Sequence, residues 1–501
     1  MQCHLETTSG RIPATLVRFD RAPFSFVPGE PLDAFMLTFD HAPGTGHDDK
    51  FEAVSSVYRL RQSKCFLRSE GKLTCDTCHN PHQVPRGAEA VAHYARACRQ
   101  CHSTSSLVAS RWHTDSQDCA ACHMPKRRAE DTPGMVMTDH LIQRRPPSGD
   151  LLAEFRERPP EEYRGEVVPY YPSPLPRTPV NELYVAVAQV GLENNAKAGL
   201  PVLAREIARQ NPGNAEFYLV LGDGWLNAGK PHEAIAAYEH AVQLSPKSSR
   251  ALRSLADALN AEEQVARAAE SLKRAVQLAP SDPLTWYRYG MLDFASGRGA
   301  DAAEKIRRAI ALDPSLPDLS RSLAEILAKS GPPRDAQAAL QEALRTDPYD
   351  DAAWDLAGRV QAETGNLPEA FYNFEKALRL RPGNATYLYD FALALVRGDR
   401  FEEAQKHAES AVRTDPNLAD AHELLGGLFA RKRQLSDAAR EYRRTLELRP
   451  DSSRTHLRLG NVLAAQGDTA GAIEHWREAA KAADTAIAQE ATRAMQQVGV
   501  R

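Results

Sequence analysis

The chain lacks several features that would assign it to a common class. Its formal net charge is only −4, so it has no basic excess of the kind that nucleic acids or acidic membranes attract. No apolar run approaches the ~18 residues that a membrane-spanning helix needs. The first residues also lack the basic and apolar stretches of a secretory signal. These absences exclude nucleic acid as an expected partner and a transmembrane segment as an expected element of this chain.

Cysteine is absent from most of the sequence. All eight cysteines lie between Cys3 and Cys122, and ten of the 16 histidines lie at or before His140. Any thiol or imidazole chemistry is therefore concentrated at the N-terminal end. Since 501 residues are too many for one ordinary core, we expect at least two structural parts.

A proline-rich segment separates the cysteine-containing part from the rest. Residues 146–179 contain nine prolines, which have a fixed φ and no backbone donor, so a regular helix or a central strand is excluded there. We expect a stiff connector over 146–180 between a first domain, 1–145, and the remainder of the chain. An ordered strap packed on a neighbour is the alternative, because Tyr170 and Tyr171 favour burial. Within 1–145, residues 14–20 and 34–40 have the character of strands.

Beyond residue 180 the sequence repeats every 34 residues. Prolines occupy positions 212, 246, 280, 314, 348, 382, 416 and 450, and alanines occupy 234, 268, 302, 336, 370, 404, 438 and 472. Glycines precede five of these alanines by twelve residues, and a large apolar residue follows the same five by four residues. Small residues let two helices approach closely, and the large residues fill the space beside the contact. The pattern predicts stacked helical hairpins.

This pattern resembles the tetratricopeptide repeat (TPR). The resemblance covers about nine repeats over 181–484, followed by a capping helix and tail over 485–501. It implies an all-α superhelical solenoid whose concave face binds a protein or peptide. A rigid spacer or a self-association surface is the alternative.

Three CxxCH motifs lie in the cysteine-containing part. They are Cys75-Asp-Thr-Cys78-His79, Cys98-Arg-Gln-Cys101-His102 and Cys119-Ala-Ala-Cys122-His123. In such a motif two thiols one helical turn apart form thioether bonds to the vinyl groups of haem c, and the histidine becomes the proximal iron ligand. The sequence therefore predicts three covalently bound haems.

Structural zinc is the competing interpretation of the same cysteines. Nineteen residues separate Cys78 from Cys98, which a zinc ribbon permits. Zinc, however, gives no reason for a histidine after the second cysteine of every pair, and three pairs do not divide into four-ligand sites. A redox dithiol explains the histidines no better. We therefore prefer haem.

Cys3 and His4 form the end of a further CxxCH motif. Its first cysteine would stand immediately before Met1, so we expect the sequence to begin inside a fourth haem motif, after the loss of an export signal. The alternative is that Cys3 is an ordinary thiol. Cys65 fits no motif; we expect a packed thiol, with a disulfide to Cys3 as the other possibility.

The distal iron ligands have to come from histidines outside the motifs. Six are available, namely His41, His47, His82, His93, His113 and His140. This excess over the few methionines favours bis-histidine ligation and low redox potentials. We select His82, His113, His140 and His41 as candidates.

The region from Cys3 to His140 is similar to the doubled-CxxCH, cytochrome c-554-like family of multihaem cytochromes. That resemblance implies an irregular, haem-packed domain with His79, His102 and His123, and His4 in a fourth motif, as proximal ligands. We therefore expect a mainly α, extracytoplasmic or periplasmic electron-transfer protein with redox partners and a TPR docking array. One alternative is a multihaem oxidoreductase that turns over a small nitrogen or sulfur compound at an open haem. The other is a zinc-binding TPR scaffold.

Overall fold

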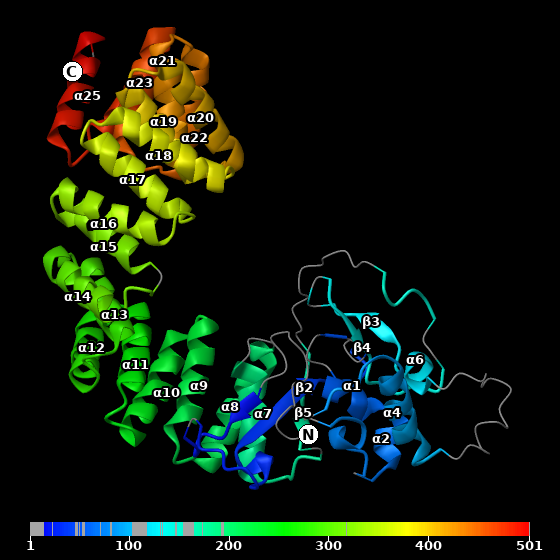
Figure 1. Cartoon of the computed structure of the whole chain (residues 1–501). Helices are drawn as coiled ribbons and strands as arrows, with labels where there is room; N and C mark the ends of the chain where they lie inside the picture. The colour runs from blue at the N-terminus through cyan, green and yellow to red at the C-terminus, as the bar shows by residue number, and fades with distance from the viewer. Residues whose placement is uncertain are drawn as a thin grey trace. The chain divides into compact units, whose positions relative to one another are not determined.

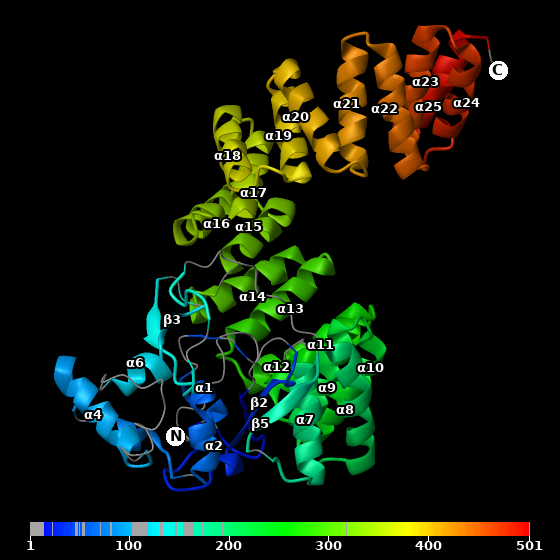
Figure 2. The same ribbon diagram turned by 90° about the vertical axis from the view of Figure 1, so that its right-hand side faces the viewer.

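The computed structural model describes most of the chain. The described residues are 15–22, 24–45, 49, 51–52, 56–70, 72–80, 83–102, 118–130, 132, 134–145, 148–153, 165–172, 174–191, 195–316 and 318–499. The chain divides into two compact units, Met1–Leu278 and Ala279–Arg501. The fold is mainly α, as expected, and Figures 1 and 2 show the helices of both units. In the described part, no helix has the length and apolar character needed to cross a membrane.

The first unit begins with a three-stranded antiparallel sheet of order β1-β2-β5. Its strands are β1 (Thr15–Val17), β2 (Met36–His41) and β5 (Val167–Tyr171), and a short 3-10 helix, η2 (Leu32–Ala34), precedes β2. The two strand-like stretches of the sequence are thus β1 and β2. β5 comes from the proline-rich segment and lies at the edge of the sheet, where a strand can contain Pro169 without losing an inner ladder bond. Leu37 and Phe39 of β2 are fully buried.

The cysteine motifs lie on short helices between β2 and β5. These helices are α1 (Ser56–Gln62), α2 (Lys64–Arg68), α3 (Cys75–Cys78), α4 (Gly87–Arg99) and α6 (Cys119–His123), and a two-stranded ribbon follows, β3 (Lys126–Arg128) with β4 (Val136–Thr138). The three helices with motif cysteines bury almost nothing. Ala95 is the buried residue of α4, and α3 and α6 have none. This part of the chain therefore has little hydrophobic core of its own.

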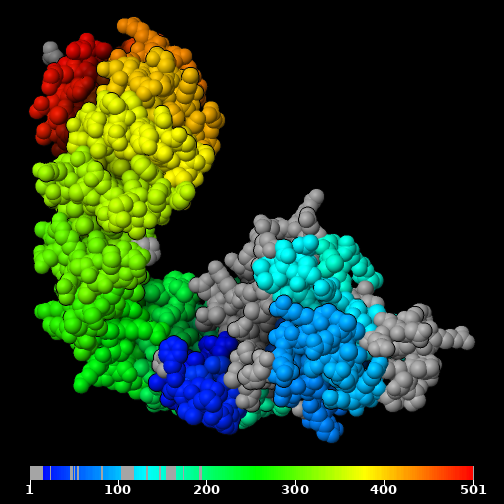
Figure 3. All heavy atoms as spheres, in the orientation of Figure 1, coloured from blue at the N-terminus to red at the C-terminus, as the bar shows by residue number. Residues whose placement is uncertain are grey.

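Paired helices make up the rest of the first unit. They are α7 (Pro179–Gly191), α8 (Ala196–Gln210), α9 (Ala215–Asn227), α10 (Pro231–Leu244), α11 (Ser249–Ala261) and α12 (Val265–Leu278). The ring of Phe19, just after β1, packs against Tyr184 and Phe217, with ring centres 5.3 and 4.8 Å apart. In Figure 3 the dark-blue N-terminal residues lie against green residues of these helices. The sheet and the first repeats thus share one core.

The second unit stacks further helix pairs as a TPR-like solenoid (Figure 1). The pairs are α13 (Pro283–Ala295) with α14 (Gly299–Leu312), α15 (Leu319–Ser330) with α16 (Pro333–Thr346), α17 (Asp351–Glu363) with α18 (Leu367–Leu380), α19 (Ala385–Arg397) with α20 (Phe401–Thr414), α21 (Ala419–Arg431) with α22 (Leu435–Leu448), and α23 (Ser453–Gln466) with α24 (Thr469–Ala479). A final helix, α25 (Thr485–Gln497), packs on α23 and α24 where we expected a capping helix.

The alanines and glycines that recur every 34 residues are packed between helices, as their spacing predicts. All eight repeat alanines, from Ala234 to Ala472, have no exposed surface. A Cβ added to Gly358 would lie 2.8 Å from the ring of Phe374, and one added to Gly426 would lie 2.7 Å from Tyr442. Each glycine thus lets the large residue of the partner helix reach its backbone.

Candidate haem-binding site

Each motif places its two thiols on one helical turn. In the first motif, α3 starts after Thr74, whose N–H donates to the Thr77 hydroxyl at 3.0 Å. The helix ends at His79, whose backbone is extended and whose N–H donates to the Cys75 carbonyl at 2.8 Å. The imidazole therefore leaves the helix directly after the second cysteine. This is the local geometry that CxxCH attachment needs.

The other two motifs occupy different positions relative to their helices. Cys98 is in the last turn of α4, and the N–H of His102 donates to the Cys98 carbonyl at 3.1 Å. In α6, the carboxylate of Asp118 caps the helix by accepting the Ala121 N–H at 3.0 Å. An acceptor at this position satisfies a helix N–H that would otherwise have no partner.

The three motifs come together in space. Partial burial of its thiol raises the pKa of Cys98 to about 11, and the nearby thiols of Cys119 and Cys78 add to this effect. Cysteines of the first and third motifs therefore lie close to Cys98 of the second motif. Cys65 is half-buried, lies close enough to contribute to the same shift, and forms no disulfide with a described cysteine.

His140 faces His79 of the first motif. Their ring centres are 6.1 Å apart, and the ring planes are inclined by 35°. Two imidazoles that coordinate one metal from opposite sides, each at about 2 Å, have ring centres about 6 Å apart. Burial lowers the pKa of His140, and the neighbouring His79 contributes, so the ring is held in the neutral form that binds metal.

A backbone contact fixes the tautomer of His140. Its Nδ1 lies 3.0 Å from the carbonyl oxygen of Thr138, which can only accept. Nδ1 therefore carries the proton and Nε2 keeps its lone pair, as is usual for a metal-binding histidine. His123 of the third motif has the same arrangement, with Nδ1 2.5 Å from the Gln143 carbonyl oxygen.

The remaining candidates occupy other positions. His102 is exposed after the end of α4. His41 ends β2, and its Nδ1 is 3.0 Å from the carboxylate of Asp40. Four predicted site residues lie outside the described residues: Cys3, His4, His82 and His113. His93, a spare histidine that we did not select, directs Nε2 at the Cys78 carbonyl oxygen at 3.0 Å.

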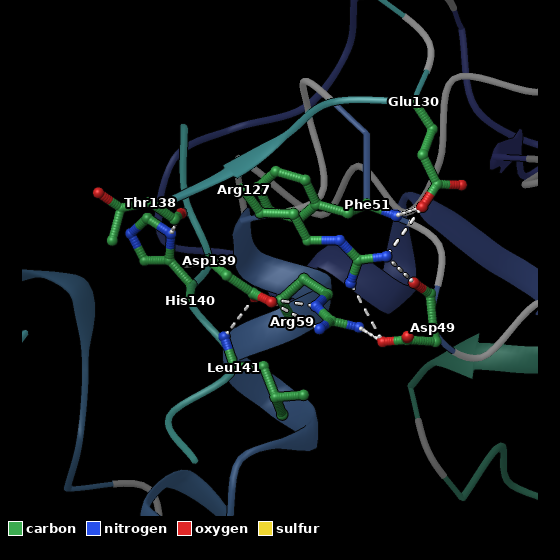
Figure 4. A network of polar contacts seen from close by, with 9 residues as sticks. All are labelled: Asp49, Phe51, Arg59, Arg127, Glu130, Thr138, Asp139, His140 and Leu141. Atoms are coloured by element: carbon green, nitrogen blue, oxygen red, sulfur yellow. Dashed lines mark hydrogen bonds and ion pairs between the residues drawn. The ribbon is translucent and has the colours of Figure 1, made fainter. Parts of the chain in front are cut away.

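A buried ion pair beside His140 was not predicted. The guanidinium of Arg59, from α1, donates to both carboxylate oxygens of Asp139, at 2.9 and 2.7 Å (Figure 4). Both side chains are 1% exposed. Burial alone would lower the pKa of Arg59, but the hydrogen bonds and charges of Asp139 and Asp49 outweigh it and raise the pKa. The one signal in the sequence is that Asp139 stands next to the candidate ligand His140; nothing in the sequence indicates Arg59 as its partner.

The cysteine pairs do not assemble the zinc site that a ribbon would need. Among the described residues, no three His, Cys, Asp or Glu side chains come together so as to hold a metal ion. A haem with two histidine ligands would need only two thiols and two opposed imidazoles from the chain. The structure therefore does not favour the zinc scaffold.

Family models match the repeat region. Residues 190–388 match the C-terminal domain of cilia and flagella-associated protein 70, and residues 337–456 match the TPR domain of cytochrome c-type biogenesis protein H. A general tetratricopeptide repeat model matches residues 428–487. Together with the helix pairs, these matches show that the chain contains a TPR array, a type of domain that binds protein or peptide partners.

Two curated relatives come from Arabidopsis thaliana. The TPR repeat-containing thioredoxin TTL4 is 33% identical over 153 residues, and the inactive TPR repeat-containing thioredoxin TTL3 is 30% identical over 144 residues. Each match covers 29% of this chain and 21% of the relative, so the chain spans about a fifth of the length of these relatives.

Solved structures with similar helices include further repeat proteins. YrrB, a TPR protein with an unusual peptide-binding site, has a TM-score of 0.33 and 24% identity, over 38% of this chain and 99% of that one. The pilF protein of Pseudomonas aeruginosa has a TM-score of 0.39 and 18% identity, over 42% and 97%.

Proposed function

We propose that this chain is an extracytoplasmic multihaem c-type cytochrome that transfers single electrons and uses its TPR array to bind a protein partner. Haem c would be attached through Cys75 and Cys78, through Cys98 and Cys101, and through Cys119 and Cys122. The location follows from the chemistry, because c-type haem is attached outside the cytoplasm in bacteria.

The observation that carries the proposal is the opposition of His79 and His140. The two rings come from segments about sixty residues apart, yet their centres are 6.1 Å apart, near the spacing of two axial ligands. The Thr138 contact leaves Nε2 of His140 ready to coordinate. Both features are those that an iron held between two histidines would require.

The small core around the motifs supports the same conclusion. Helices α3 and α6 bury none of their residues, although three motifs meet there. An ordinary domain of this size is stabilised by burying apolar side chains. Haem groups would supply apolar surface to α3, α4 and α6 and so provide the missing core.

The opposed imidazoles favour electron transfer over substrate turnover. When bound, haem supplies an iron that exchanges one electron at a time. His79 and His140 would both hold the iron, so the chain's own side chains would leave no coordination site for a substrate. His82, His113 and His41 are the candidates for the second ligands of the haem irons that His102 and His123 would hold.

Haem attachment is tested by expressing the chain behind an export signal in a bacterium with the cytochrome c maturation system. We expect haem that stays on the polypeptide in a denaturing gel, and a pyridine haemochrome content of at least three per chain. Replacing both Cys75 and Cys78 by Ala should lower the content by one, because the thioether bonds of one haem are lost.

Cys65→Ala is the matched control. Cys65 lies beside the motifs but outside them, so its loss should leave the haem content unchanged. A chain that carries zinc and no haem would contradict the proposal and revive the scaffold. Carbon monoxide binding by the native protein would instead point to an open haem and to an oxidoreductase.

A further inference from the structure

We infer that Arg59 is a positioning residue that, through Asp139, holds His140 opposite His79 and so secures the second axial ligand of the first haem. The inference rests on the proposed function and adds a residue outside every motif to that site.

Arg59 binds Asp139 with the geometry of a rigid fork. Its Nε donates to Oδ1 at 2.9 Å and its Nη2 donates to Oδ2 at 2.7 Å, so the carboxylate can neither rotate nor slide. Its Nη1 donates to Asp49 at 2.8 Å, which fixes the guanidinium from a third direction. Arg127, from β3, lies 3.3 Å from the same Asp49 oxygen (Figure 4). Asp139 and Asp49 therefore hold the guanidinium of Arg59 from two sides, and Arg127 contacts Asp49.

Asp139 in turn fixes the backbone on both sides of His140, on one side through its own N–H and on the other through its carboxylate. The N–H of Asp139 donates to the Pro125 carbonyl at 2.9 Å, and the N–H of Leu141 donates to Oδ1 of Asp139 at 2.9 Å. The ring of His140 is then oriented by the contact of Nδ1 with Thr138. The contacts of Asp139 thus set the position of the His140 imidazole, and the contact with Thr138 sets its rotation. Arg59 in turn holds the carboxylate of Asp139 in place.

Regular secondary structure does not hold this segment in place. β4 ends at Thr138, and residues 139–143 continue without helix or strand. A fully buried ion pair is an expensive way to stabilise a fold, because both charges lose their water. Such a pair is better explained by the geometry that it imposes, and here that geometry places His140.

The test compares Arg59→Met with the native protein. Methionine keeps much of the apolar volume but cannot hold Asp139, so His140 should leave its iron in a fraction of molecules. We expect a high-spin signal in electron paramagnetic resonance and binding of up to one carbon monoxide per chain. The haem content should stay unchanged, because the thioether bonds do not depend on Arg59.

Three further variants separate positioning from general damage. His140→Ala should give the same carbon monoxide binding, and adding Arg59→Met to it should cause no further change. Arg59→Lys keeps the charge but not the fork, so it should give an intermediate effect and fold even if the methionine variant does not. Arg61→Met is the matched control on the same helix. Arg61 lies over the ring of Tyr170, 4.6 Å from its centre, so this variant also removes a guanidinium from α1 but keeps the bonds between Arg59 and Asp139.

The outcomes distinguish this inference from the proposed function. Native protein without haem would overturn the proposed function. Native protein with its haems, together with Arg59→Met and Arg59→Lys proteins that stay low-spin and bind no carbon monoxide, would overturn the role of Arg59 alone. Equal effects of Arg59→Met and Arg61→Met would also overturn it, because they would indicate a general loss of structure.

Discussion

At the scale of single residues, the packing of the repeats depends on glycines at which an added methyl group would collide with the partner helix. Gly358 lies on α17 against Phe374 of α18, which is completely buried. The same relation recurs at Gly290 with Ile306 and at Gly460 with Trp476. The 34-residue phase predicted these contacts because each depends on two residues within one hairpin.

Gly358→Ala should therefore destabilise the second unit. Alanine favours a helix over glycine by ~1 kcal/mol, but an overpacked core costs about 1–3 kcal/mol, and the added Cβ would lie 2.8 Å from the completely buried Phe374 ring. We expect a lower urea midpoint by circular dichroism. Gly383→Ala is the control, because a Cβ there meets nothing within 4 Å and its midpoint should not fall. Equal midpoints for native and Gly358→Ala protein would show that the close approach is unimportant.

Other single-residue contacts were beyond our sequence analysis. Ring nitrogens six residues after a repeat proline bond its carbonyl oxygen, in the pairs Trp286 with Pro280, Trp354 with Pro348, His422 with Pro416 and His456 with Pro450. The regular spacing is a signal that could have revealed them. Arg59 and Asp139 offer no such signal, because eighty residues separate them and neither belongs to a repeat.

At the scale of elements, neighbouring repeats can bring charges together that no single repeat contains. Asp355 of α17 and Asp390 of α19 are 7% and 11% exposed, and Arg359 is 3.7 and 3.9 Å from them. Burial raises the pKa of Asp355, and the charge of Asp390 raises it further. Oδ1 of Asp355 has no hydrogen-bond partner among the described residues. The pair therefore favours a protonated state.

This pair should make the stability of the second unit fall as the pH rises. The folded chain keeps a proton that the unfolded chain releases at about pH 4, so the contribution of Asp355 to stability is greatest below that pH and declines until its folded pKa of about 8 is reached. Asp355→Asn should remove much of the decline and raise the urea midpoint at pH 8 relative to native protein. The exposed Asp335→Asn should leave the decline intact. A native midpoint that rises from pH 5 to pH 8 would contradict the sign.

Elements of the N-terminal part followed from the sequence only in part. The strand-like character of 14–20 and 34–40 indicated β1 and β2, and the CxxC spacing indicated a helical turn at each motif. The pairing of β5 with β2 could not be predicted, because it joins residues about 130 positions apart and includes Pro169. Likewise, the sequence offered four of the six spare histidines as candidate distal ligands, and only folding placed His140 beside His79.

At the scale of the whole molecule, compact units do not coincide with the composition boundaries. The sequence suggested a division at the proline-rich segment, over 146–180, whereas the first compact unit continues to Leu278. The cause is long-range packing: the N–H of Phe19 donates to the hydroxyl of Tyr184, 165 residues away, at 2.6 Å. The N-terminal sheet and the first repeats are thus in direct contact, and the motifs belong to the same compact unit.

The central claim, that the motifs hold covalent haem, is tested most directly by mass spectrometry of peptides from the exported protein. The account predicts that the peptides containing Cys75–Cys78, Cys98–Cys101 and Cys119–Cys122 each carry the mass of one haem, whereas the peptide containing Cys65 carries none. Unmodified cysteines in all three motif peptides, from cells that attach haem to another c-type cytochrome, would contradict it.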